Sequence, residues 1–86
     1  MGYRLLDLTG VVTREDFYNR IAEDLELSEC GRNLDALHDV FSTSALTLVI
    51  TGFEDMKKNL GAYADTFIMM MDDTADEHSG FTYILR

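Results

Sequence analysis

Ala45-Leu46-Thr47-Leu48-Val49-Ile50-Thr51 occupies the middle of the chain. Nearly every position in this run is apolar or β-branched, and polar residues do not alternate with apolar ones. Such a run is typical of a strand that is covered on both faces within a parallel sheet. Gly52 follows the run and ends it. The stretch therefore predicts a parallel strand at residues 45–51 with both faces covered.

Two further strands are predicted near the ends of the chain. Residues 3–9 are short and rich in apolar side chains, and Gly10 stops them. Residues 81–85 follow Gly80 and are mostly aromatic or β-branched. Segments with helical periodicity separate the three strands, which implies right-handed crossovers between parallel strands. The order of the strands in the sheet stays open.

Four helices are predicted between the strands. The first begins at Thr13, whose spacing to Asp16 fits a capping box, and it ends near Leu25. Asn33 is a suitable N-cap for the second helix. The second, third and fourth helices are expected at residues 34–41, 53–60 and 62–73, respectively. The predicted fold class is α/β, a small three-stranded parallel sheet packed by about four helices in a single domain at residues 1–86.

The charge and composition exclude several classes of partner. Seven Lys and Arg residues against sixteen Asp and Glu residues give a net charge of −9. Such a charge repels nucleic-acid phosphates and anionic lipids and favours basic protein partners. One cysteine and no secretory-signal pattern favour a reducing, cytoplasmic location. The longest apolar run, residues 67–71, is too short to span a membrane.

The second helix is predicted to present two carboxylates together. At about 100° per residue, one arc of this helix is apolar and faces the core, and it consists of Leu34, Leu37, Val40 and Phe41. Asp35 and Asp39 point away from that arc, with His38 beside them. The pair is either a solvated surface or a set of anions that occupies the cationic pocket of a nucleic-acid enzyme. The spacing leaves both readings open.

The segment that leads into this helix carries a family resemblance. It reads Cys30-Gly31-Arg32-Asn33-Leu34-Asp35-Ala36-Leu37-His38-Asp39. It resembles the signature of the barstar family, intracellular inhibitors of a secreted bacterial ribonuclease, and the order of strands and helices agrees along nearly the whole chain. The resemblance implies a barstar-like fold and a non-catalytic inhibitor without a cofactor. Its second helix and the preceding loop would plug the active site of a ribonuclease.

The resemblance also implies roles for particular residues. Asp39 would take the place of a substrate phosphate, and Asp35 would meet the enzyme's basic rim. The other partner-binding positions implied are Cys30, Gly31, Asn33, Leu34, His38, Ser42 and Asp73, with Asp72 as the alternative to Asp73. The family has aromatic residues where this chain has Cys30 and His38. A target different from barnase, the secreted ribonuclease that barstar inhibits, is therefore expected. Aromatic residues are common anchors of protein interfaces.

The expected partner is a basic extracellular or toxin ribonuclease, bound one to one by an immunity protein or antitoxin that is monomeric when free. The alternative function is an acidic interaction module of the DNA-mimic type, without a ribonuclease target. Such a mimic would spread its acids over many surfaces, whereas Asp35 and Asp39 form a local pair. Nucleic acid and membrane are not expected as partners.

Other chemistries have little support in the sequence. His38 and His78 lie forty residues apart and Cys30 has no second thiol, so no metal site is expected. Ser42 has no His–acid partner that would make it a nucleophile, so no enzymatic activity is expected. The Met69-Met70-Met71 run is predicted to fill the core.

Overall fold

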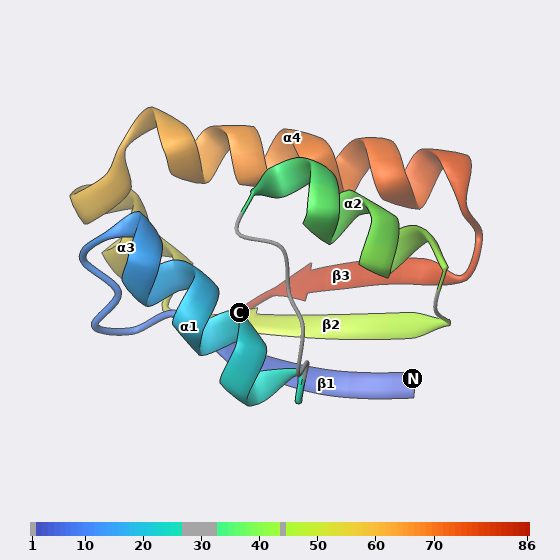
Figure 1. Ribbon diagram of the computed structural model, residues 1–86, viewed down its shortest axis with the longest axis horizontal. Helices are drawn as coiled ribbons and strands as arrows, with labels where there is room; N and C mark the ends of the chain where they lie inside the picture. The colour runs from blue at the N-terminus through green and yellow to red at the C-terminus, as the bar shows by residue number, and fades with distance from the viewer. Residues whose placement is uncertain (1, 27–32, 44) are drawn as a thin grey trace.

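The computed structural model describes residues 2–26, 33–43 and 45–86. These residues form three strands and four helices, with a pair of helices between each strand and the next (Figure 1). In chain order they are β1 (Gly2–Asp7), α1 (Arg14–Asp24), α2 (Leu34–Ser42), β2 (Leu46–Thr51), α3 (Phe53–Leu60), α4 (Ala62–Glu77) and β3 (Phe81–Leu85). The predicted α/β class, a three-stranded parallel sheet with four helices, is confirmed.

The three strands pair in the order β1-β2-β3, and both pairings are parallel. The sequence had left this order open. In the register, Leu5 lies beside Val49, and Val49 lies beside Ile84. The apolar run at residues 45–51 therefore contains the central strand, β2. The connection from β1 to β2 contains α1 and α2, and the connection from β2 to β3 contains α3 and α4.

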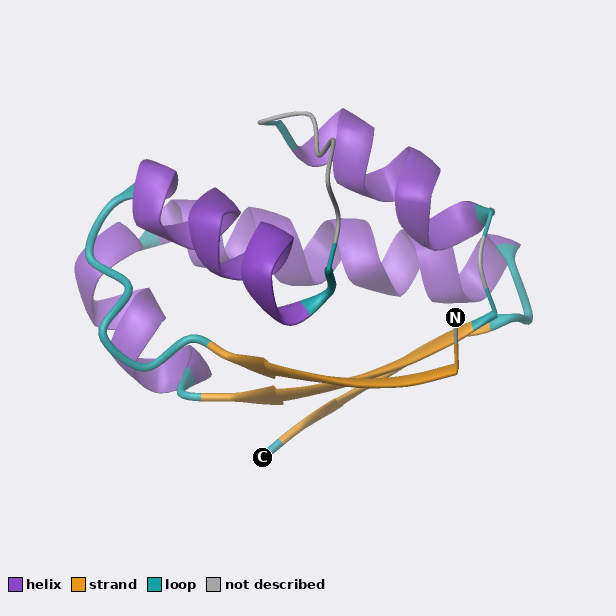
Figure 2. Ribbon diagram, turned by 60° about the horizontal axis from the view of Figure 1, so that its bottom comes forward, coloured by secondary structure: helices purple, strands orange, loops and turns teal. Residues whose placement is uncertain are grey.

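The helices cover only one face of the sheet, as Figure 2 shows. Leu46, Leu48 and Ile50 belong to the hydrophobic core on that face. The expectation that both faces of β2 would be covered is therefore wrong, because the described helices pack on one face only. Val49 is still only 1% exposed because it lies between the two outer strands, whereas its neighbours Leu5 and Ile84 on the open face are 55% and 43% exposed. Central position, not a second helical layer, accounts for the apolar run.

Helix α1 begins as its sequence predicts. The Thr13 side chain accepts a hydrogen bond of 3.1 Å from the backbone N–H of Asp16. The Asp16 carboxylate in turn accepts one of 3.3 Å from the N–H of Val12. These bonds satisfy donors that the first helical turn leaves free. Phe17 and Ile21 on the inner face of α1 are fully buried.

Helix α4 is longer than the sequence indicated, ending at Glu77 rather than at residue 73. The extra turn places Glu77 and the following His78 at the end of α2. The methionine run is divided between two environments, because Met71 is fully buried while Met69 is 66% exposed. The prediction that the run fills the core holds for Met71 and for Met70, which packs against the core, and is wrong for the exposed Met69.

Strand β3 is tied to α4 by a hydrogen bond of 2.5 Å from the Tyr83 hydroxyl to the Asp72 carboxylate. Burial, and then this bond, raise the pKa of Tyr83 to about 12 from 10.0. An elevated folded-state pKa means that stability is complete below about pH 10 and is lost as the pH rises toward about 12. Because Tyr83 is only half-buried, we expect a loss of about 1 kcal/mol over that range.

This expectation is checked by urea unfolding at several alkaline pH values, with Tyr83→Phe as the matched control. The variant lacks the phenolic proton, so the other titrating groups cancel in the difference between the two proteins. Parallel stability curves for the two proteins would show that the Tyr83–Asp72 bond has no influence on unfolding.

Candidate functional site

The packing of α2 decides which of its side chains face outward. Leu37 and Phe41 are fully buried. The Phe41 ring stacks on that of Phe81 at the start of β3, with centroids 4.9 Å apart and an angle of 10° between the planes. Stacking and burial of this kind fix the rotation of the helix. Leu34 and Val40 are only partly buried against the same core.

The start of α2 is capped as predicted. The Asn33 side-chain oxygen accepts a hydrogen bond of 2.8 Å from the N–H of Ala36. A cap of this type contributes about 1 kcal/mol to helix stability. Asn33 is itself exposed at the head of the helix. The residue therefore has a demonstrated structural role, and any contact with a partner would come in addition to it.

Asp35 and Asp39 are both exposed on the outer side of α2. Asp35 lies in the first turn, where the helix dipole favours a negative charge, whereas Asp39 lies in the last turn, where the dipole opposes it. The two charges also repel each other at a spacing of four residues. Asp39 is thus placed where it works against the stability of its own helix.

Ser42, at the end of α2, has its hydroxyl engaged within the helix. The Ser42 Oγ donates a hydrogen bond of 3.1 Å to the backbone carbonyl of Asp39, and the Thr43 Oγ1 donates another to the same oxygen at the same distance. Ser42 lines a small hollow of about 370 Å³ that also includes Glu77 and His78. A partner would find an acceptor oxygen on Ser42 rather than a free donor.

A groove of about 490 Å³ runs between α2 and α4. Helix α2 contributes Leu34, Asp35 and His38, and α4 contributes Thr66, Met69, Met70, Asp73 and Glu77. The structure thus brings together Asp35, His38 and Asp73, which the family resemblance had grouped from distant parts of the sequence. Asp72 does not line the groove and instead accepts the Tyr83 hydrogen bond. Asp39 lies outside the groove lining, one residue beyond His38.

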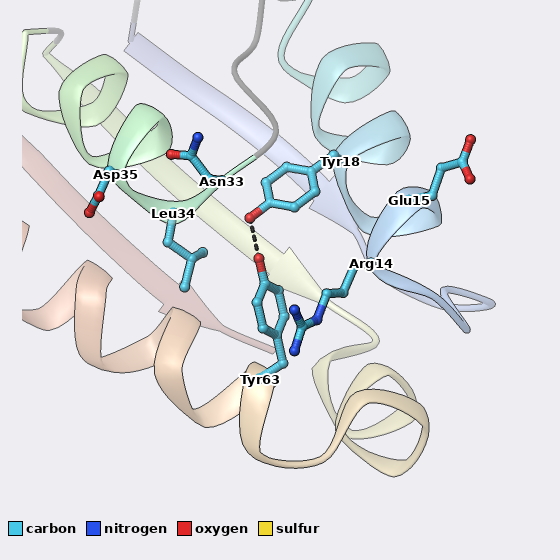
Figure 3. Close-up of a pocket in the computed structure, with 7 residues that line it drawn as sticks. All are labelled: Arg14, Glu15, Tyr18, Asn33, Leu34, Asp35 and Tyr63. Atoms are coloured by element: carbon cyan, nitrogen blue, oxygen red, sulfur yellow. Dashed lines mark hydrogen bonds between the residues drawn. The ribbon is translucent and has the colours of Figure 1, made fainter.

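A second, larger cleft of about 680 Å³ borders the head of α2 (Figure 3). Its walls come from α1, the start of α2 and α4, and consist of Arg14, Glu15, Tyr18, Asn33, Leu34, Asp35 and Tyr63. The Tyr18 and Tyr63 hydroxyls are hydrogen bonded to each other. The Arg14 guanidinium carbon lies 4.2 Å from the centre of the Tyr63 ring, a cation–π arrangement. No sequence pattern predicts this cleft, because its residues come from three separate helices and the residue that caps one of them.

The structure also joins two residues that the sequence placed far apart. His38 Nε2 lies 3.6 Å from Glu77 Oε2, and His78 Nε2 lies 3.8 Å from the same oxygen. The two imidazole ring centroids are 6.3 Å apart. The separation of forty residues in the sequence therefore does not reflect the distance between the histidines in space. No group of three or more His, Cys, Asp or Glu side chains in the described part of the chain is arranged to hold a metal ion.

Helices α2 and α4 share an unusual charge pattern. Helix α2 carries Asp35 and Asp39, and α4 carries five acids, Asp65, Asp72, Asp73, Asp76 and Glu77. Neither helix contains a lysine or an arginine. Asp65 is paired with Lys57 of α3 at 3.3 Å. The described residues that line the groove between the two helices therefore include three carboxylates but no lysine or arginine.

Cys30 and Gly31 lie outside the described residues, so the two predictions that fall on them have no structural counterpart here. No helix in the described ranges is both long enough and apolar enough to cross a membrane.

Comparison with known protein families identifies the family to which the chain belongs. The family model described as "Barstar (barnase inhibitor)" matches residues 1–86. This chain belongs to the barstar family. The match covers the whole chain, so the resemblance seen at residues 30–39 extends to both crossovers and to all three strands. No curated protein matches the sequence.

The description of the family names an inhibitory activity. Barstar-family proteins are ribonuclease inhibitors of the barnase-inhibitor type and not enzymes. The acid-bordered groove and the outward carboxylates of α2 lie on one side of this barstar-family fold, where α2 and α4 pack together.

Proposed function

We propose that this barstar-family protein inhibits a cationic ribonuclease by covering the enzyme's active site with α2 and the adjoining groove. The observation that carries the proposal is the group of outward carboxylates on α2 and α4, which no lysine or arginine of either helix neutralises. An enzyme that binds RNA presents a cationic cleft, and arginine side chains bind carboxylates with the geometry they use for phosphates. The acidic surface is complementary to such a cleft.

Within this proposal, Asp39 takes the position of a substrate phosphate. Its location in the last turn of α2, where the helix dipole disfavours it, is consistent with a residue kept for binding rather than for stability. Asp35 of α2 and Asp73 of α4 both line the groove, and in this proposal they meet the basic rim of the enzyme. Leu34 forms a wall of both the groove and the larger cleft, and supplies apolar contact between them.

The proposed partner is a basic extracellular or toxin ribonuclease, bound one to one by an inhibitor that is monomeric when free and resides in the cytoplasm as an immunity protein or antitoxin. A net charge of −9 would accelerate association with a cationic enzyme at low ionic strength. Cys30 and His38 replace aromatic positions of the family signature. The cognate enzyme is therefore expected to differ from barnase in the surface that meets these two positions.

A titration of ribonuclease activity tests the proposal. Barnase and any nuclease encoded beside this gene are assayed for RNA cleavage with increasing amounts of the protein. We expect one of these enzymes to lose its activity at a one-to-one ratio, and to associate more slowly as salt shortens the Debye length. Full cleavage by every tested enzyme with the inhibitor in excess would refute the proposal.

The alternative, a DNA mimic, predicts a different dependence on individual residues. A mimic spreads its binding energy over many acids, so alanine substitutions on α1, α3 and α4 would weaken a captured partner about as much as those on α2. Loss of binding concentrated on α2 and the groove supports the inhibitor.

A further inference from the structure

The only two histidines of the chain meet around one carboxylate. His38 projects from α2, and His78 follows the last residue of α4. Glu77 Oε2 lies 3.6 Å from His38 Nε2 and 3.8 Å from His78 Nε2. All three side chains are partly exposed. The cluster joins the groove, which contains His38 and Glu77, to the hollow beside it, which contains Glu77 and His78.

The contacts within this cluster depend on the charge of the histidines. Both N···O distances exceed the usual range for a hydrogen bond, so the attraction is mainly electrostatic and requires imidazolium. Histidine is the side chain that ordinarily changes its charge between pH 5 and 8, while carboxylates generally stay ionised above about pH 5. Histidine is therefore the type of side chain through which mild acid changes the charge of such a cluster.

The charged groups that face the cluster come from both helices. Asp35 of α2 lies on one side of the groove, and Asp73 and Glu77 of α4 lie on the other. Asp39 follows His38 on the exposed side of α2. No lysine or arginine is among the described residues that line the groove or the hollow. Two imidazolium groups would thus reduce the charge of the described residues that line the groove and the hollow together from three negative charges to one.

We propose that protonation of His38 and His78 weakens the binding of a cationic partner in this groove, so that the inhibitor releases its target in mildly acidic conditions. The inference rests on the proposed function for the identity of the partner. The imidazolium groups of the inhibitor and the cations of the partner compete for the same carboxylates, so proton binding and partner binding weaken each other. Like charges placed opposite one another across an interface also oppose association.

A cationic peptide without a titratable group in this range isolates the effect. Hexa-arginine with an acetylated N-terminus and an amidated C-terminus is added to the ¹⁵N-labelled protein at pH 7.5 and at pH 5.5, and dissociation constants are measured from the amide shifts of α2 and α4. Arginine stays protonated throughout, so any pH dependence belongs to the inhibitor. We expect binding at the groove at pH 7.5, weakened by about tenfold at pH 5.5.

The matched control carries His38→Gln together with His78→Gln, which keeps polar side chains of similar size without an ionisable group. For this variant we expect less than a twofold change between the two pH values. An equal loss of affinity in the wild type and in the double variant would overturn the proposal, as would a pH-independent wild type. Absence of binding at the groove at pH 7.5 would also overturn it, because the groove would then not attract cations.

The same proteins distinguish this inference from the proposed function. Ribonuclease inhibition is measured separately at pH 7.5. Intact inhibition with pH-independent peptide binding rejects only the histidine mechanism. Absent inhibition with histidine-dependent peptide binding rejects only the ribonuclease target.

Discussion

Replacement of Asp39 by alanine is expected to weaken binding of the target ribonuclease by roughly 2 to 5 kcal/mol, because it leaves a desolvated cation of the enzyme without its partner. Most of the loss should come from faster dissociation. The same substitution should leave the fold intact and raise the free energy of unfolding by a few tenths of a kcal/mol, since it removes a negative charge from the last turn of α2 and its repulsion with Asp35.

Two measurements on the same variant separate binding from folding. Urea unfolding reports stability, and surface-based kinetics with the inhibited ribonuclease report association and dissociation rates. Glu54→Ala is the matched control, since it removes one exposed carboxylate from α3, away from the α2–α4 face. It should reduce the association rate slightly, through net charge alone. If Asp39→Ala and Glu54→Ala had the same small effect, Asp39 would be an ordinary surface acid.

Replacement of Gly52 by alanine is expected to destabilise the protein by about 3 kcal/mol, a large share of the roughly 5 to 15 kcal/mol typical of a domain. Gly52 has a backbone φ of +72°, which costs about 1 to 2 kcal/mol for a residue with a side chain. A Cβ at this position would also lie 2.4 Å from both the backbone nitrogen and the Oγ1 of Thr9. The chain after β1 would have to move away from the end of β2.

That movement would disturb a network of hydrogen bonds at the strand ends. The Asp7 carboxylate accepts bonds from the Thr9 N–H at 3.0 Å and from the Thr51 hydroxyl at 3.2 Å. The Thr9 backbone bond is the main reason why the pKa of Asp7 is lowered from its usual value. Stability linked to Asp7 is therefore present at neutral pH and is lost as the pH falls through the folded-state pKa.

Gly10→Ala is the control for the contact with Thr9. Gly10 also has a positive φ, +83°, but a Cβ there would meet no atom within 4 Å. Urea unfolding should therefore show a cost of about 1 to 2 kcal/mol for Gly10→Ala, smaller than for Gly52→Ala. Equal costs at the two positions would mean that backbone strain alone, and not the contact with Thr9, limits position 52.

Local features of the candidate site could be predicted because they depend on neighbours in the chain. The Asn33 cap and the outward Asp35–Asp39 pair follow from helix geometry, which operates over three to four residues. The Thr13 cap of α1 is another example. The grouping of Asp73 with the α2 acids came instead from the family resemblance. It is not a consequence of local spacing.

Features that join distant segments could not be predicted in this way. The exposure of Met69 depends on which side of α4 faces α2 and the core, and a run of three methionines gives no periodicity from which to choose. The larger cleft depends on Tyr18 of α1 meeting Tyr63 of α4. The sequence did not predict that helices cover only one face of the sheet. A central strand with a neighbouring strand on each side is as apolar as a strand that is covered by helices on both faces, so the two cases have the same sequence pattern.

The sequence by itself determined the strands and helices, the caps and the excess of negative charge, since propensity, periodicity and composition are properties of short stretches or of sums over the chain. Only the tertiary structure decided the strand order, the open face of the sheet and the meeting of His38 with His78 at Glu77. The physical reason is that the shared core packs α2 against α4 and stacks Phe41 on Phe81, which brings side chains forty residues apart to within a few ångströms of one carboxylate.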